Sequence, residues 1–393
     1  MRILHTSDWH LGRSFGPVSL AGEQERFCDA LADIAADQRI ELVVIAGDIY
    51  DRAIAPTHSI ELFRDTVRRL RSAGVVIAAI SGNHDGADRV SPYDDLLDAS
   101  GVYIRGGYEG IGRVIRHEFA DGPLDLALLP FLDPQAAPDL FGATPAGESG
   151  EGGDALERRR RRTHQSVLAA AMATTRAGLA APRSLAVAHA FVTGGSVSDS
   201  ERQLEVGGTG EVPADIFDGF SYTALGHLHR PQDITRPTLR YSGTPMPYSF
   251  SEDHTKSVTI IDMDPTGVCA IDAIDLAVGR GVRTVTGTID ELLEPARHPD
   301  AHERFVRAIV TDRETVLDAK ARLERVYPHV VEVRLEPAGG RAAVAAGPTV
   351  EIHELRPIDA VTGFWADLEG SEPDGDLLDI LTSAVATAER GAS

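Results

Sequence analysis

The amino-acid sequence predicts an α/β fold built on a largely parallel β-sheet. Short apolar runs alternate with helical stretches through the first half of the 393-residue chain. The runs at 42–46 and 75–80 contain no polar residue, which is typical of strands buried on both faces. Strands that alternate with helices form βαβ units, and the strands of such units pair in parallel.

The remaining elements of the first part follow from the same patterns. Helices are expected at 22–36 and at 57–73, where apolar residues recur at helical spacing, and Gly74 ends the second helix. We assign residues 1–280 to this first domain. Further strands are expected at 3–6, 124–129, 185–188, 222–225 and 256–262.

A second domain and a tail follow the first domain. Strands expected at 282–288, 305–310 and 330–335, with a helix at 314–326, predict a small α+β domain at 281–340. A Gly/Ala-rich linker at 341–348 leads to an acidic, helical tail at 349–393. Apolar residues of the tail have no core of their own, so they predict docking on this protein or on a partner. They are Phe364, Trp365, Leu368, Leu377, Leu378, Ile380 and Leu381.

Two local features fall between these elements. The stretch 141–154 is rich in Gly, Glu, Ser and Pro, which predicts an exposed loop. A run of arginines at 158–162 then opens a helix that continues through 168–172. The run is either a solvated face of that helix, which we favour, or a contact to a nucleic-acid backbone.

Composition restricts the class of protein. The formal net charge of −22 argues against a DNA-binding protein that works alone, because contacts to phosphate need basic side chains. The two cysteines, Cys28 and Cys269, are far apart, as in a protein of a reducing compartment. We expect no secretory leader and no membrane-spanning segment, and therefore a cytoplasmic protein.

Chemically active side chains follow five of the expected strands. In open α/β sheets the functional site lies beyond the carboxyl ends of the strands, so these turns are expected to converge on one crevice. Gly47, Gly82 and Gly226 allow the sharp turns that bring the side chains inward. The residues are Asp8, His10, Asp48, Asp51, Asn83, His84, Asp85, His189, His227 and His229.

These residue types indicate a metal site. Carboxylates, imidazoles and an amide oxygen, without thiolates, suit Mn²⁺, Fe²⁺ or Zn²⁺. There are too many ligands for one ion, and two ions that share a carboxylate lie about 3.5–4 Å apart, as in enzymes that hydrolyse phosphate esters. Each motif alone is weak, because a histidine after a strand is more often structural and Gly-Asp is commonly a turn. Five motifs in order, each after a strand, favour the metal site.

The motifs resemble those of the calcineurin-like metallophosphoesterase superfamily, and longer segments resemble its SbcD family, the nuclease subunits of bacterial SbcC–SbcD complexes. The resemblance covers residues 1 to about 265 and is looser beyond. It implies a two-layer β-sandwich flanked by helices, an α+β cap, and a tail that docks on an ATPase partner. The segments that carry it are 6–12 (TSDWHLG), 47–51 (GDIYD), 188–192 (AHAFV), 198–202 (SDSER), 224–229 (ALGHLH) and 241–245 (YSGTP).

The resemblance also implies roles for the site residues. The cofactor would be two divalent ions, which we expect to be Mn²⁺. The ligands would be Asp8, His10 and His229 for one ion, Asn83, His189 and His227 for the other, and Asp48 as the bridge. His84 matches the catalytic histidine of the family, which contacts the substrate phosphate and is not a ligand. Asp51 would orient the His84 ring through its ring N–H.

The implied function is a two-metal hydrolase that cuts DNA. It would combine double-strand exonuclease with single-strand or hairpin endonuclease activity and work with an SbcC-like ATPase in DNA repair, recombination and replication. The ATPase would supply positive surface, the bound ions would attract phosphate, and two nuclease subunits would pair as a homodimer. The alternative is a stand-alone phosphoesterase for small phosphodiesters or phosphomonoesters, which suits the charge but leaves 281–340 and the tail without a use. A scaffold with an inactive site ranks last, because every ligand position is filled.

Overall fold

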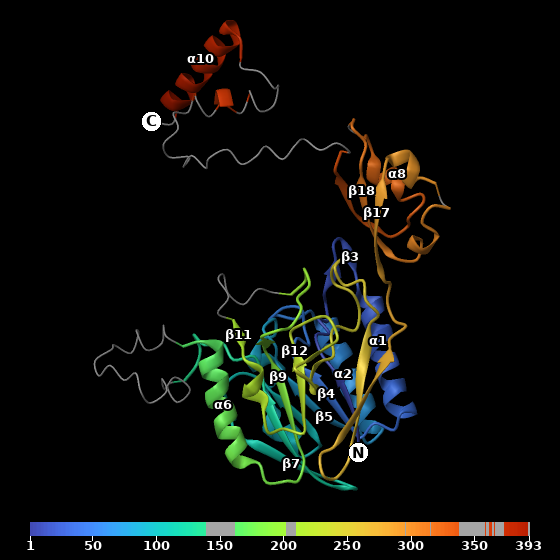
Figure 1. The fold of residues 1–393 in the computed structure, drawn as a ribbon, viewed down its shortest axis with the longest axis vertical. Coiled ribbons are helices and arrows are strands. Elements are labelled where there is room, and N and C mark those ends of the chain that lie inside the picture. The colour runs from blue at the N-terminus through green and yellow to red at the C-terminus, as the bar shows by residue number, and fades with distance from the viewer. Residues whose placement is uncertain are drawn as a thin grey trace, which may run out of the picture. The chain divides into compact units, whose positions relative to one another are not determined.

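Two six-stranded β-sheets packed face to face form the centre of the protein in this computed structural model (Figure 1). The structure describes residues 1–138, 162–201, 210–294, 296–314, 316–337, 358, 361–363, 365 and 373–391. The first sheet, in the order β16-β15-β1-β4-β5-β6, contains β1 (Arg2–Thr6), β4 (Leu42–Ala46), β5 (Val76–Ile80), β6 (Val102–Arg105), β15 (Ser257–Met263) and β16 (Cys269–Asp275). The second, in the order β13-β14-β12-β9-β8-β7, contains β7 (Val114–Phe119), β8 (Gly122–Leu129), β9 (Ser184–His189), β12 (Tyr222–Gly226), β13 (Gln232–Ile234) and β14 (Arg236–Tyr241).

The inner strands of both sheets run parallel, as the alternation of strands and helices predicts. β1, β4, β5 and β6 pair in parallel, and so do β8, β9, β12 and β14. The expected parallel pairing does not extend to β15, β16, β7 and β13, which pair antiparallel. Short turns join β7 to β8, β13 to β14 and β15 to β16, and such a turn reverses the chain without a helical crossover.

Helices cover the outer face of each sheet. α1 (Ala21–Asp37) and α2 (Thr57–Ser72) pack on the first sheet, and α6 (His164–Gly178) packs on the second (Figure 1). Thr163 caps α6 by accepting a hydrogen bond from the Ser166 N–H, so the helix begins after the arginine run and not within it.

β4 shows why the apolar runs predict this layered arrangement. Successive side chains of a strand point to opposite faces. Leu42 and Val44 belong to the core between the two sheets, whereas Val43 and Ile45 belong to the core beneath α1 and α2. A strand covered on both faces therefore needs an unbroken apolar sequence. The two-layer β-sandwich flanked by helices is confirmed.

Shorter elements complete this part of the chain. They are β2 (Ser14–Phe15), β3 (Val18–Ser19), α3 (Ala87–Val90), α4 (Asp94–Asp98), β10 (Phe191–Val192), β11 (Glu211–Val212) and the 3₁₀ helix η2 (Ala214–Phe217). The hairpin of β2 and β3 follows the turn that carries Asp8 and His10.

A three-stranded parallel sheet follows the double sheet. Its strands β17 (Val282–Gly287), β18 (Phe305–Val310) and β19 (Val330–Leu335) enclose a separate apolar core with α7 (Ile289–Leu292), η3 (Pro299–Ala301) and α8 (Ala319–Leu323). Phe305 stacks on Phe15 of β2, with ring centroids 4.9 Å apart and planes inclined by 7°. Both sheet systems belong to one compact unit, Met1–Leu335, so a domain boundary near residue 281 stays a prediction.

The helix expected at 314–326 is shorter than the sequence predicts. Asp318 adopts a left-handed backbone conformation, with φ of 51°, and α8 begins only at Ala319. A left-handed residue cannot continue an α-helix, which explains the late start. Apolar spacing does not detect this conformation.

A second unit, Glu336–Ser393, contains α10 (Gly375–Gly391). Leu378 and Ile380 on this helix are exposed. Several sequence predictions lie outside the described residues: the loop 141–154, the arginines 158–161, the linker 341–348, Phe364 and Leu368. Within the described residues, every helix is too short or too polar to cross a membrane.

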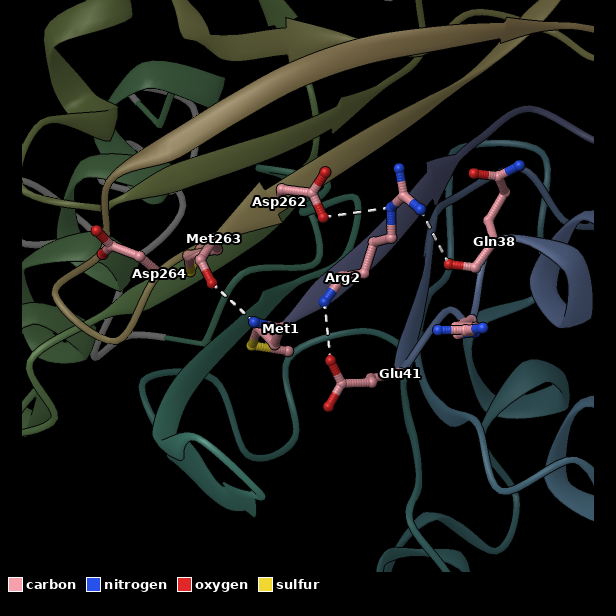
Figure 2. Close-up of a pocket in the computed structure, with 8 residues that line it drawn as sticks. Met1, Arg2, Gln38, Glu41, Asp262, Met263 and Asp264 are labelled. Atoms are coloured by element: carbon pink, nitrogen blue, oxygen red, sulfur yellow. Dashed lines mark hydrogen bonds and ion pairs between the residues drawn. The ribbon is translucent and has the colours of Figure 1, made fainter.

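A shallow pocket of about 440 Å³ opens at the amino end of β1 (Figure 2). Its polar groups bond to one another: the Arg2 N–H donates to Glu41 at 3.0 Å, and the Arg2 side chain lies 3.2 Å from Asp262. The pocket lies at the opposite end of β1 from Asp8 and His10, and none of the sequence-predicted site residues lines it.

Leu126 tests the packing between the two sheets. Its side chain is fully buried in the inter-sheet core, so Leu126→Ala should lower the free energy of unfolding by about 2–5 kcal/mol. Urea denaturation followed by circular dichroism measures the change. Leu96→Ala, at a leucine that is 76% exposed, is the matched control and should have little effect. Equal midpoints for the two variants would contradict this packing.

Candidate metal centre

The turns after five strands meet at one edge of the double sheet. Backbone hydrogen bonds join the turn after β1 to the turn after β4: the Asp8 N–H donates to the Gly47 carbonyl at 3.0 Å, and the His10 N–H donates to the Asp48 carbonyl at 2.9 Å. The His227 N–H, after β12, donates to the Asp8 carboxylate at 3.0 Å. The predicted convergence is therefore present in the structure.

One cluster of candidate ligands comprises Asp8, His10 and His229. Each offers a ligand atom, and these atoms lie within 4.8 Å of one another. The Nε2 atoms of His10 and His229 are 3.3 Å apart. The other ring nitrogen of His229, Nδ1, lies 2.6 Å from the Ser200 hydroxyl, so Nε2 is the atom that faces the cluster.

A second cluster is centred on the Asn83 side-chain oxygen. It lies 2.9 Å from His189 Nε2 and 3.1 Å from His227 Nδ1. The His189 Nδ1 atom bonds to the Ala46 backbone carbonyl at 2.9 Å. Because a carbonyl only accepts, Nδ1 carries the proton and Nε2 presents its lone pair to the cluster.

Asp48 lies between the two clusters. Its Oδ2 atom is 3.6 Å from His10 Nε2 in the first cluster and 3.6 Å from His189 Nε2 in the second. The carboxylate is almost fully buried, and its Oδ1 atom accepts a hydrogen bond from the His84 N–H at 2.9 Å. This is the position that a bridging ligand requires.

Glycine is needed where the turns approach one another. A Cβ atom at Gly226 would lie 1.8 Å from the Ala46 carbonyl oxygen, and one at Gly82 would lie 2.1 Å from Asp48 Oδ1. Asp48 also adopts a left-handed conformation, with φ of 49°. Such conformations cost about 1–3 kcal/mol each and gather at functional sites.

The electrostatics of the clusters fit divalent cations. Burial lowers the pKa of His10, His189 and His227, so these rings are neutral, the form that binds metal. Burial and the charge of Asp48 raise the pKa of Asp8 well above its usual range. Two adjacent buried carboxylates disfavour each other's charge, and a bound cation removes that penalty.

His84 lies beside the first cluster, with its ring centroid 4.7 Å from that of His10. Its Nδ1 atom is 2.9 Å from the backbone carbonyl oxygen of Asp51. Asp51 therefore contacts the ring as predicted, but through its main chain and not through its carboxylate. The carboxylate instead lies 3.8 Å from His10 Nδ1 and 3.6 Å from Arg13.

Asp85 ties two of the turns together. Its carboxylate accepts hydrogen bonds from the N–H groups of Ile49 at 3.1 Å, Tyr50 at 2.8 Å and Gly82 at 2.8 Å. Burial, with the nearby charge of Asp48, raises the pKa of Asp85 to about 7. The sequence places Asp85 in the motif, but only the structure shows this bracing role.

Other residues around the ligands were missed by sequence reasoning. Glu201 accepts a hydrogen bond from the His229 N–H at 2.7 Å, and Gln24 donates to the His10 carbonyl at 2.8 Å. Ser200 and Glu252 surround the His229 ring. The segment 198–202 is part of the family resemblance and could have pointed to Ser200 and Glu201, whereas Glu252 belongs to none of the motifs.

Comparisons with known proteins agree with this geometry. Residues 1–231 match the family model of the calcineurin-like phosphoesterases. The SbcD subunit of the nuclease SbcCD from Bacillus subtilis (strain 168) is 36% identical over 273 residues, which cover 67% of either chain. This chain belongs to the SbcD family of calcineurin-like phosphoesterases. A second relative with the same name, from Staphylococcus epidermidis, is 25% identical over 334 residues and 84% of either chain.

The C-terminal part of this SbcD-family chain also matches a family model. Residues 278–369 match the model SbcD_C, described as the type 5 capsule protein repressor C-terminal domain. A glutamine-dependent NAD⁺ synthetase from Acinetobacter baumannii aligns over 100% of this chain and 72% of its own, with 9% identity and a TM-score of 0.26. A similarity at that level carries no inference.

Removing single ligands tests the shared position of Asp48. Asp48→Ala should lose both ions, because the carboxylate lies between the clusters, whereas Asn83→Ala should mainly lose one. Elemental analysis after dialysis measures the metal content. Asp121→Ala is the control, because Asp121 bonds to the N-terminal amine beyond the opposite end of β1. A single ion in the active wild-type protein would sink the two-metal assignment.

Proposed function

We propose that this chain is the nuclease subunit of an SbcC–SbcD-type complex. It hydrolyses DNA phosphodiesters as a double-strand exonuclease and as a single-strand or hairpin endonuclease, and it acts in the cytoplasm in DNA repair, recombination and replication. The observation that carries the proposal is the Asp48 carboxylate, 3.6 Å from a histidine of either cluster, in a chain whose relatives are named as SbcCD nuclease subunits.

Two divalent ions, for which we propose Mn²⁺, would supply an activated water and would neutralise charge on the phosphate. Asp48 would hold both ions, and each cluster of three residues would complete one site. The buried histidines and carboxylates of the clusters would keep the ions fixed in a site shielded from bulk water. The first cluster is Asp8, His10 and His229, and the second is Asn83, His189 and His227.

His84 acts on the substrate and not on the metal in this proposal. The Asp51 carbonyl accepts a hydrogen bond from Nδ1, which leaves Nε2 free. When the ring is protonated, Nε2–H donates to a phosphate oxygen or to the leaving 3′-oxygen. His84 is only half-buried, so a substrate can reach the ring. General-acid assistance of this kind is worth about 10²–10⁴-fold in rate.

The sheet of β17, β18 and β19 forms the cap that helps to select duplex DNA. The Phe305–Phe15 stack connects this sheet to the hairpin that follows His10. The Arg307 guanidinium lies 4.3 Å from the centre of the Phe250 ring and adds a second contact between the two sheet systems. A substrate that touches the cap would therefore be held near the first cluster.

The proposal includes two protein partners. The tail 349–393 docks on an SbcC-like ATPase, which supplies much of the positive surface that this acidic chain lacks. Two nuclease subunits associate as a homodimer within the complex. Individually exposed apolar side chains, among them Ile54, Tyr93 and Leu96, are candidates for that contact.

Cleavage assays test the function directly. The purified chain should cut labelled linear duplex and hairpin DNA only when Mn²⁺ is present, and an SbcC-like ATPase should increase the rate. Bis(p-nitrophenyl) phosphate serves as a small-substrate control. Hydrolysis of the small phosphoester without cleavage of DNA, even with the partner present, would replace this proposal by the stand-alone phosphoesterase.

His84→Ser should separate chemistry from metal binding. The variant should keep both ions and DNA binding but lose about two or more orders of magnitude in cleavage rate. Metal content, DNA affinity and cleavage rate are measured on the same preparation. His117→Ser is the matched control, because His117 bonds to Tyr103 at the edge of the sheets. Loss of a metal ion, or near-wild-type cleavage, would refute the catalytic assignment.

Deleting residues 349–393 should abolish binding to the ATPase but spare hydrolysis of bis(p-nitrophenyl) phosphate, because the candidate ligands lie in the separate unit Met1–Leu335. Co-purification of the two tagged proteins measures the association. Unchanged co-purification of the truncated chain would show that the tail is not the docking segment.

A further inference from the structure

Glu252 is a buried carboxylate next to the first cluster, and the proposed mechanism gives it no role. Its side chain is fully buried. Oε2 accepts hydrogen bonds from Lys256 Nζ at 2.5 Å and from the Thr244 hydroxyl at 2.8 Å. Oε1 accepts hydrogen bonds from the Ser200 hydroxyl at 2.5 Å and from the Tyr248 N–H at 3.1 Å. Lys256 balances its charge, so Glu252 remains an ionised acceptor.

These contacts determine the direction of hydrogen bonding around His229. An ionised carboxylate can only accept, so the Ser200 hydroxyl donates its proton to Glu252. The Ser200 oxygen must then accept from His229 Nδ1, which lies 2.6 Å away. His229 is thereby held with its proton on Nδ1 and the lone pair of Nε2 directed at His10 and the cluster.

The two clusters are held in different ways. In the second, the tautomer of His189 is set by a backbone carbonyl, that of Ala46. In the first, the tautomer of His229 is set by side chains: by Ser200, 2.6 Å from Nδ1, and by Glu252, whose Oε1 bonds to Ser200 and lies 3.4 Å from the same nitrogen. Side-chain substitutions can therefore weaken one cluster while leaving the other intact.

We propose that Glu252 and Ser200 are positioning residues that set the affinity of one ion only, the ion held by Asp8, His10 and His229. The inference rests on the proposed two-metal function. It adds that Glu252 and Ser200 control the affinity of one metal site without changing that of the other. It also gives a use to the segments 198–202 and 241–245, because Ser200 and Thr244 both bond to Glu252.

Ser200→Ala is the primary test, because it removes the nearer partner of His229 Nδ1, leaves only the longer 3.4 Å contact to Glu252, and keeps the Glu252–Lys256 ion pair. Calorimetric titration with Mn²⁺ should show one site about 10–100-fold weaker and the other unchanged. At limiting Mn²⁺ the electron paramagnetic resonance spectrum should change from that of a spin-coupled pair toward that of a single ion. Ser200→Thr, which retains the hydroxyl, should restore tight binding at both sites.

The double variant Glu252→Met with Lys256→Met removes the acceptor without leaving a buried lysine unpaired, and it should weaken the same site. Asp125→Asn is the matched control: Asp125 is also buried, and it bonds to Arg116 and to the Ala180 and Ala181 N–H groups in the second sheet. Its metal binding should equal that of the wild type.

The outcomes distinguish this inference from the function on which it rests. A wild-type chain that fails to bind two ions overturns the two-metal function itself. A wild-type chain that binds two ions, with unchanged affinities in both Ser200→Ala and the double variant, overturns the positioning role. An equal loss at both sites in either variant overturns the claim that only one ion is affected.

Discussion

The burial of Asp48 and Asp8 beside each other is the constraint on which the rest of the site depends. Two adjacent carboxylates out of contact with water are unstable as a pair of anions, and divalent cations are the partners that resolve this. The surrounding turns leave room for these two carboxylates to lie side by side. Gly82 leaves room for the Asp48 carboxylate, and Gly226 lets the turn after β12 approach β4.

The net charge of −22 opposes DNA binding only if the charge of the whole chain, and not the charge at the site, determines the attraction to DNA. Divalent cations bound at the clusters would act on phosphate at short range, where the local charge and not the net charge of the chain determines whether phosphate is attracted. Long-range attraction of DNA is a separate requirement, and a basic partner can meet it. In the proposed complex, the metal centre and the ATPase would together provide the attraction to phosphate that basic side chains provide in a DNA-binding protein working alone.

Sequence periodicity predicts the layers well, because burial on both faces demands an unbroken apolar strand such as 42–46, whose bounds the structure reproduces. It also predicts that the candidate ligands lie together, because they follow strands whose carboxyl ends share an edge of the double sheet. Sequence periodicity fails where a backbone conformation sets the end of an element or where residues far apart in the sequence come into contact. Asp318 has a positive φ, which delays the start of a helix. Asp51 contacts His84 through its backbone carbonyl, and the identity of a side chain does not predict a backbone contact. Glu252 reaches Ser200, 52 residues away, through the fold alone.

Anomalous X-ray diffraction from crystals grown with Mn²⁺ tests the two-metal site without relying on activity, because it locates each ion. We predict two peaks about 3.5–4 Å apart, one beside each cluster, with the Asp48 carboxylate in contact with both. A single peak, or two peaks of which Asp48 contacts only one, would contradict it.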